Sequence, residues 1–318
     1  MVKKGKKICV LGAGNVGATI AYTLALDGTA NEIVLVDINK EKAVGEAMDI
    51  IQGTVFTSPV NLYAGEYCDC QDADMVVVTV GMARKPGQTR LDLAQSNINI
   101  IKAVMPQIAK YAPDAIYVVV SNPVDILTYA IIKSSGIPES QIIGSGTLLD
   151  SARLRSRLAE HVGIPAQNVH AYVFGEHGDT AMIPWSLTTI AGMEMTQYCT
   201  NICENHNHCG KKELYDIGED VRTAGAKVIS LKGATYYAIA MTVRRICESV
   251  IRDSDSILTV STLTNGRYGL PDVALSLPAV VGARGIERYI TPPLTDEELQ
   301  QLHKSANALR SVIDSLDI

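Results

Sequence analysis

The chain has 318 residues, 47% apolar and 19% charged, which is typical of a folded protein with one large or two smaller domains. Its net charge of −6 argues against nucleic acid as the main partner. We expect no membrane partner, because neither an apolar signal segment nor a run of about 18 apolar residues occurs. Seven cysteines without a disulfide-scaffold spacing favour the reducing cytoplasm.

A glycine-rich turn follows the first predicted strand, at residues 8–11, and precedes helical spacing at 18–26. In this context the G-x-G-x-x-G pattern supplies a tight turn, a close backbone approach to a pyrophosphate and a helix packed against the strand. The helix N-terminus would favour the phosphates. The candidate contacts are Gly12, Gly14, Asn15, Val16 and Gly17.

The second predicted strand, residues 33–36, ends in an acidic residue. Asp37 lies 20 residues after Gly17, where a carboxylate can accept both ribose hydroxyls and would repel a 2′-phosphate. We therefore expect NAD rather than NADP as the cofactor. A surface aspartate closing a strand is the alternative.

Two further apolar runs, 75–80 and 116–120, alternate with helical patterns at 41–51 and 97–111. Such alternation predicts an α/β fold with a Rossmann-type doubly wound parallel sheet covered on both faces. Ligands of such sheets bind at the carboxyl ends of the strands. The candidate cofactor contacts there are Gly81, Asn97 and Asn122.

A basic loop lies between Gly81 and the next helix and carries Arg84 and Arg90. Three cations beside one proline and one glycine suit a mobile lid that brings charge to an anionic ligand. A solvated basic loop is the alternative.

A histidine between two glycines follows a predicted strand at 169–174. His177 titrates near neutrality, so it can move a proton both ways, unless it is only a turn residue. Asp150 and Arg153 share one face of a helix predicted over about 148–162. They form either a surface ion pair or a pair in which Asp150 orients His177 and Arg153 binds a carboxylate.

The second half of the chain predicts an α+β substrate domain. We place the division at 1–146 and 147–318. Its predicted elements are a strand at 181–190, helices at 211–232 and 234–252, antiparallel strands at 256–261, 269–276 and 278–281, and a final helix opened by Thr295 in a capping box with Glu298.

Cysteines and histidines cluster at Cys199, Cys203, His206, His208 and Cys209. Their spacing matches no tetrahedral zinc pattern well, so we expect a polar helix end and loop there, and no metal.

Five motifs resemble the lactate/malate dehydrogenase family over nearly the whole chain. They are G-A-G-N-V-G at 12–17, G-Q-T-R-L-D-L at 87–93, S-N-P-V-D at 121–125, L-D-S-A-R at 149–153 and G-E-H-G-D at 175–179. The resemblance implies an NAD-dependent hydride transfer. It assigns acid/base chemistry to His177, its orientation to Asp150, the substrate carboxylate to Arg153, carbonyl polarisation to Arg90 and a substrate-oxygen contact to Asn122.

One position separates the two branches of this family. Six residues before the lid arginine, lactate dehydrogenases usually carry glutamine and malate dehydrogenases arginine; here it is Arg84. Two other residues resemble the lactate branch: Glu176, before the histidine, and Thr235, which would crowd the pocket. If substrate binding removed the water around Arg84, the second carboxylate of oxaloacetate would pair with it, whereas the methyl group of pyruvate would leave it unpaired at a cost of about 3–5 kcal/mol. We therefore expect a malate dehydrogenase of the tricarboxylic acid cycle, acting on (S)-malate and oxaloacetate; an L-lactate or broad 2-keto acid dehydrogenase is the alternative.

The resemblance also implies a homo-oligomer, a dimer or a tetramer. Arg155 is turned about 200° from Arg153 on a helix, and His170 would face away from His177 on a continuous strand. In similar bacterial lactate dehydrogenases the matching arginine and histidine bind fructose bisphosphate across a subunit interface. Arg155 and His170 are thus candidates for an allosteric polyanion site, or else interface residues without a ligand.

A non-catalytic dinucleotide-binding redox sensor is a third functional hypothesis. Such a protein would be expected to lose some of His177, Asp150, Arg153 and Arg90, and all four are present.

Overall fold

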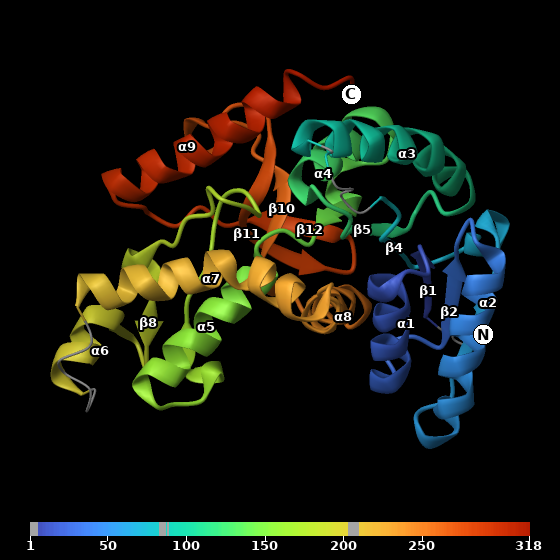
Figure 1. The fold of residues 1–318 in the computed structure, drawn as a ribbon, viewed down its shortest axis with the longest axis horizontal. Coiled ribbons are helices and arrows are strands. Elements are labelled where there is room, and N and C mark those ends of the chain that lie inside the picture. The colour runs from blue at the N-terminus through green and yellow to red at the C-terminus, as the bar shows by residue number, and fades with distance from the viewer. Residues whose placement is uncertain (1–5, 83–86, 88, 203–209) are drawn as a thin grey trace.

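The computed structural model describes residues 6–82, 87, 89–202 and 210–318, without the side chains of Arg90 and Lys211. In the first half, strands alternate with helices (Figure 1). The strands are β1 (Lys7–Leu11), β2 (Glu32–Val36), β3 (Asn61–Ala64), β4 (Met75–Val78), β5 (Ile116–Val119) and β6 (Ile142–Gly144), and the helices are α1 (Asn15–Asp27), α2 (Lys40–Gly53), α3 (Arg90–Tyr111) and α4 (Val124–Ser134). The strands pair in parallel in the order β3-β2-β1-β4-β5-β6, a Rossmann-type sheet.

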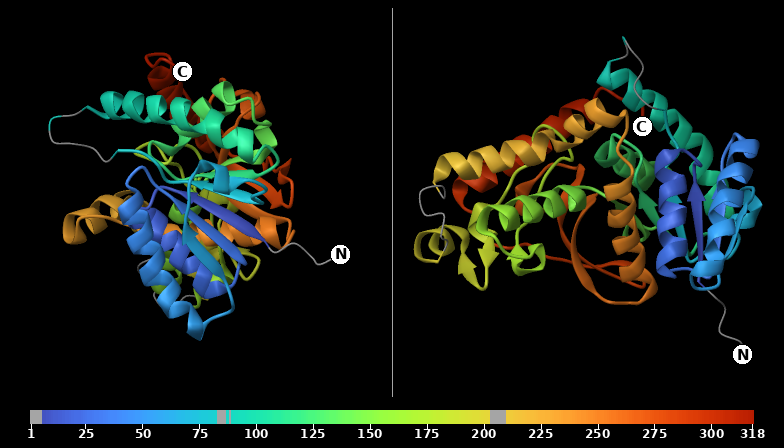
Figure 2. Two further views of the ribbon diagram at one scale, coloured as in Figure 1. Left: turned by 90° about the vertical axis from the view of Figure 1, so that its right-hand side faces the viewer. Right: turned by 60° about the horizontal axis from the view of Figure 1, so that its bottom comes forward.

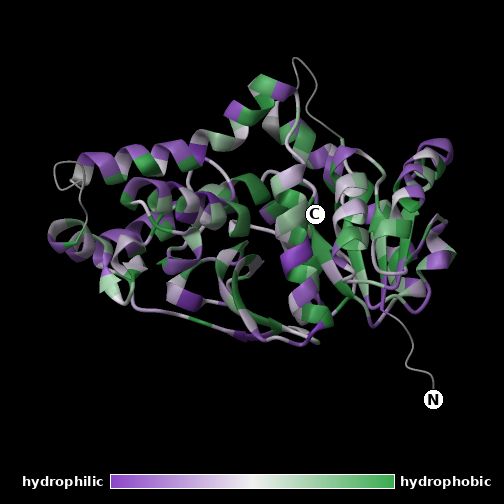
Figure 3. Ribbon diagram, turned by 90° about the horizontal axis from the view of Figure 1, so that it is seen from below, coloured by the Kyte–Doolittle hydropathy of each residue, from purple (hydrophilic) through white to green (hydrophobic). Residues whose placement is uncertain are grey.

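The sheet is buried on both faces. Along β1, Cys9 and Leu11 enter a core shared with α3, α4 and α9 (Asp296–Ile313), whereas Ile8 and Val10 enter a core shared with α1, α2 and α8 (Tyr237–Ile251). This is why the strands are continuous apolar runs rather than alternating ones. Figure 3 shows hydrophobic strands among helices with hydrophilic segments, and the two views of Figure 2 show helices on either side of the sheet.

The second half extends the same sheet. Its remaining elements are α5 (Leu148–Val162), β7 (Val169–His170), β8 (Thr189–Ile190), β9 (Met193–Glu194), α6 (Met195–Asn201), α7 (Lys211–Lys232), β10 (Ser256–Leu263), β11 (Ala274–Gly282) and β12 (Gly285–Tyr289). Strands β10, β11 and β12 are antiparallel, and β10 joins β6 at the pair Ser261–Gly144. Short 3₁₀ helices are η1 (Thr54–Phe56), η2 (Tyr67–Cys70), η3 (Glu139–Gln141), η4 (Ala166–Asn168), η5 (Trp185–Leu187) and η7 (Arg267–Gly269). The expected fold class, a doubly wound parallel sheet followed by an α+β part, is confirmed.

Several predicted strands are wrong in extent. The two strands expected at 269–276 and 278–281 are the single strand β11. The strand expected at 169–174 is β7, only two residues long, followed by an isolated bridge from Phe174 to Met182. The strand expected at 181–190 is interrupted by η5 and reduced to the bridge at Met182 and the two residues of β8; Pro184, just before η5, cannot donate a ladder hydrogen bond. Among the described residues, no helix is both long and apolar enough to span a membrane.

Candidate active site

The glycine turn between β1 and α1 is tightly packed except at one position. Gly12 has φ +102°, and a Cβ on Gly17 would overlap the Gly12 carbonyl oxygen. A Cβ on Gly14, in contrast, would meet nothing within 4 Å. Helix and strand therefore approach closely, while the Gly14 backbone stays open to a phosphate group, as a bound dinucleotide requires.

The carboxylate of Asp37 lies against this turn. Its Oδ2 accepts the Ala13 N–H at 2.6 Å and its Oδ1 accepts the Asn39 N–H at 2.8 Å. Asp37 thus sits at the end of β2, beside the glycine turn. The position suits the adenosine ribose, so the described residues fit a dinucleotide.

A buried amide connects two loops at the carboxyl end of the sheet. Asn97, 1% exposed, accepts the Met82 N–H through Oδ1 at 2.8 Å and donates to the Asn122 carbonyl at 2.8 Å. Asn122 precedes a cis peptide bond to Pro123. Asn97 therefore fixes the start of the basic loop against the loop that carries Asn122, with Gly81 packed beside its side chain.

Two neighbouring side chains of α5 meet a third from the loop after β7. The Nδ1 atom of His177 lies 2.6 Å from Asp150 Oδ2, and Arg153 Nη1 donates to Asp150 Oδ1 at 2.8 Å. Asp150 is 7% exposed. Its carboxylate therefore orients the imidazole with one oxygen and the guanidinium with the other.

The electrostatics of this cluster favour the charged forms. Burial alone would lower the pKa of His177, but the hydrogen bond and charge of Asp150, together with the charge of Asp125, raise it above its ordinary value. Burial alone would raise the pKa of Asp150, but His177 and Arg153 hold it below its usual range. An imidazolium beside a carboxylate is a ready proton donor.

A cavity of about 510 Å³ contains this cluster and reaches the glycine turn. Six expected site residues line it: Val16, Asn122, Asp150, Arg153, His177 and Thr235. The sequence did not lead us to expect Arg222 and Gly225 of α7, which also line it. A Cβ on Gly225 would lie 3.8 Å from the Arg153 guanidinium, so glycine leaves room above that cation.

The remaining candidates lie elsewhere. Arg84 and the side chain of Arg90 fall outside the described residues. Arg155 donates to the Ala166 carbonyl at 3.3 Å, and its buried Nε has no partner in the described part of the chain. His170 is exposed on β7, and neither it nor Arg155 lines the cavity. The continuous strand invoked for His170 is absent, since β7 ends there.

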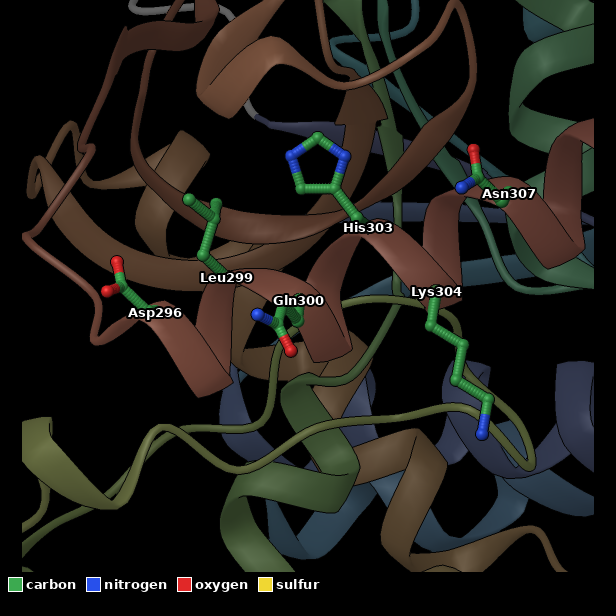
Figure 4. A pocket seen from close by; sticks show the side chains of 6 residues that line it. All are labelled: Asp296, Leu299, Gln300, His303, Lys304 and Asn307. Carbon is green, nitrogen blue, oxygen red and sulfur yellow. The ribbon is translucent and has the colours of Figure 1, made fainter.

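Of the cysteine–histidine cluster, the structure describes only Cys199. Cys199 is buried on α6, while Cys203, His206, His208 and Cys209 lie outside the described residues. In the ranges that the structure describes, no group of three or more histidine, cysteine or acidic residues could hold a metal. A hollow of about 620 Å³ on α9 is lined by one helix only (Figure 4), and its His303 ring nitrogen lies 2.8 Å from the Tyr268 carbonyl oxygen.

A dinucleotide turn joined by one cavity to a His–Asp–Arg cluster defines the class of NAD-linked dehydrogenases of 2-hydroxy acids. The chain belongs to the lactate/malate dehydrogenase family: the model of the family's NAD binding domain matches residues 6–144, and that of its alpha/beta C-terminal domain matches 147–317. Its cofactor is NAD.

Relatives cover the whole chain. It is 50% identical over 313 residues to an L-lactate dehydrogenase of Acetivibrio thermocellus (98% of each chain), and 49% identical over 315 residues to L-lactate dehydrogenase 1 of Clostridium acetobutylicum (99% of this chain, 100% of the relative). Among solved structures, a lactate dehydrogenase from a Medee basin deep-sea metagenome library superposes with a TM-score of 0.93 at 40% identity (97% of this chain, 98% of the other). The ligand-bound minor L-lactate dehydrogenase of Enterococcus mundtii gives 0.94 at 37% identity (99% and 100%).

The expectation of a malate dehydrogenase that acts on a dicarboxylic substrate in the tricarboxylic acid cycle is wrong, because these relatives are L-lactate dehydrogenases. That expectation rested on Arg84 losing its water when substrate binds. A cation that keeps its water pays no desolvation penalty when pyruvate, which has no second carboxylate, is bound. One loop residue is therefore weak evidence for substrate against full-length similarity.

Proposed function

We propose that this chain is an NAD-dependent L-lactate dehydrogenase that interconverts pyruvate and L-lactate. The observation that supports it is the contact of Asp150 with both His177 and Arg153, in a cavity that also reaches Val16 of the glycine turn. The names of the full-length relatives favour lactate as the 2-hydroxy acid.

Each residue of the cluster has a distinct task in this proposal. NAD, when bound, supplies or accepts the hydride. Asp150 accepts from Nδ1 of His177, which leaves Nε2 to donate a proton to the carbonyl oxygen of pyruvate or to take one from the hydroxyl of lactate. Arg153 binds the substrate carboxylate, for which its fork of donors is suited.

The remaining candidates complete the site. Arg90 and Asn122 contact the substrate oxygen, where negative charge develops, and Thr235 bounds the pocket. The cofactor is held by the glycine turn, Asp37 and the loop ends at Gly81, Asn97 and Asn122. In this proposal Arg84 permits pyruvate as substrate and does not select a dicarboxylate.

We further propose the division into an NAD-binding part, residues 1–146, and a substrate-binding part, 147–318. The ranges of the two family models support it. The cytoplasm remains the proposed location, on the cysteine pattern noted above.

Exposed apolar side chains on the surface support the proposal of a homo-oligomer. Large apolar side chains are exposed on two helices that pack together, Tyr22 and Leu26 on α1 and Tyr237 and Met241 on α8. Exposed apolar groups of this size on adjacent elements mark protein interfaces. The polyanion site at Arg155 and His170 is proposed with it, because the buried Arg155 Nε has no partner in the described residues.

The reaction is tested by its product. Incubation with pyruvate and NADH should give L-lactate in amounts equal to the NADH consumed, measured by an enantioselective assay. NADH oxidation without lactate, or formation of D-lactate, would contradict the proposal.

A further inference from the structure

An acidic residue is buried in the first turn of α4. The helix reads VDILTYAIIKS, and Asp125 is its only carboxylate, 2% exposed among apolar neighbours. The helix N-terminus favours a negative charge at this position, but by itself this does not require burial. A buried carboxylate is costly unless other groups compensate it.

The groups around Asp125 connect it to the active site. Its Oδ2 accepts the backbone N–H of His177 at 2.7 Å. Its Oδ1 is buried and, among the described residues, has no hydrogen-bond partner of good geometry; the same holds for the buried Ser261 hydroxyl. Among the described residues the carboxylate is thus only partly satisfied, and its hydrogen bond of good geometry is to the backbone of His177, the residue that moves the proton.

The charged and polar groups that face Asp125 come from three elements. His177 and Glu176 lie on the loop after β7, Ser261 lies on β10, and Asp150 on α5 reaches the far side of His177. Burial, together with the charge of Glu176, raises the pKa of Asp125 to about 6. The Ser261 hydroxyl and the N–H and charge of His177 act in the opposite direction and lower it. In turn Asp125, like Asp150, raises the pKa of His177.

We propose that Asp125 is a second positioning residue for His177, holding its backbone through Oδ2 and favouring the imidazolium through its charge. Asp150 acts on the ring and Asp125 acts on the main chain, so the histidine is held from two sides. Asp125 contributes to proton transfer only through His177. The inference rests on the proposed function, in which His177 is the acid and base.

The test is an NMR titration of the full-length protein labelled with [13Cε1]histidine. The chain has six histidines, and the His177 signal is assigned by its loss in His177→Asn. Asp125→Asn keeps an acceptor for the N–H and removes the charge. We expect it to lower the His177 midpoint by about half to one pH unit. The basic limb of the pH profile of pyruvate reduction should move down by the same amount.

A matched control is Glu298→Gln on α9. Glu298 is also buried and also accepts a backbone N–H, that of Ser186 at 2.9 Å. The substitution removes the same charge away from the cluster, and the His177 midpoint should stay unchanged.

An unchanged His177 midpoint in folded Asp125→Asn would overturn the inference. Should that variant not fold, Asp125→Ser retains a small acceptor and is expected to lower the midpoint likewise; no shift there has the same meaning. The titration needs no turnover, so a wild type that does not reduce pyruvate would contradict the proposed function and not the pairing of Asp125 with His177.

Discussion

Replacing Asp150 with asparagine tests whether the Asp150 carboxylate stabilises the protonated form of His177. The substitution keeps the size of a side chain that is 7% exposed and removes the charge between His177 and Arg153. A hydrogen bond to a charged partner is worth about 1.5–3 kcal/mol. At 1.36 kcal/mol per pKa unit, the pKa of His177 should fall by roughly one to two units.

The direction in which the pH profile should move follows from the protonation state of His177 that the reaction needs. Pyruvate reduction requires the imidazolium, so the rate is lost as pH rises through the pKa of His177. In Asp150→Asn that limb should lie about one to two pH units lower, and kcat at neutral pH should fall roughly 10- to 100-fold. Steady-state kcat from pH 5 to 9 with saturating NADH and pyruvate measures it.

Stability should change with pH as well. Because the pKa of His177 is raised in the folded protein, its stabilising effect is complete at pH values below its ordinary pKa and is lost as the pH rises through the folded-state pKa. Because the pKa of Asp150 is lowered, its stabilising effect is complete above its ordinary pKa and is lost as the pH falls through the folded-state pKa. The gap in free energy of unfolding between wild type and variant should therefore be largest between about pH 4 and 6.5. An unmoved kinetic limb and a gap independent of pH would refute the reasoning.

Three further predictions concern cofactor, proton and effector. Asp37→Ser should narrow the preference for NADH over NADPH, measured as kcat/KM; a wild type with equal values for both would exclude Asp37 as the selector. His177→Asn should bind NADH nearly as wild type, by fluorescence titration, and lose roughly 10²–10⁴-fold in kcat; retained activity would remove it from the mechanism. Fructose bisphosphate or pyrophosphate should change activity or assembly of the wild type but not of an Arg155→Leu, His170→Ala double variant, and an equal response in both would exclude this site.

Regular elements were predictable where one local signal dominated. The pattern of 211–232 predicted α7 to the residue, and the Thr295–Glu298 box begins α9 as expected. Long-range pairing was not predictable. Two strands are expected at 269–276 and 278–281, yet β11 runs through Pro278, because pairing with β12 begins only at Ala279.

The candidate site shows the same limit. The glycine turn and Asp37 can be inferred from spacing, since both belong to one strand–helix–strand unit. Asp150 and His177 are 27 residues apart and meet only through the fold, so the residue pattern leaves a surface ion pair of Asp150 and Arg153 as an alternative, and the family resemblance favours the pairing with His177. Asp125 was overlooked, although a lone carboxylate in an apolar helix is itself a signal. Arg84 alone predicts the wrong substrate, because one cation is weaker evidence than similarity over the whole chain.

The central claim is that pyruvate, rather than oxaloacetate, is the substrate. The most direct measurement is kcat/KM for the two acids side by side, with NADH, in wild type and in Arg84→Gln. The wild type should prefer pyruvate, and the variant should increase that preference by removing a charge that only a second carboxylate can use. A wild-type kcat/KM that is higher for oxaloacetate would contradict the account.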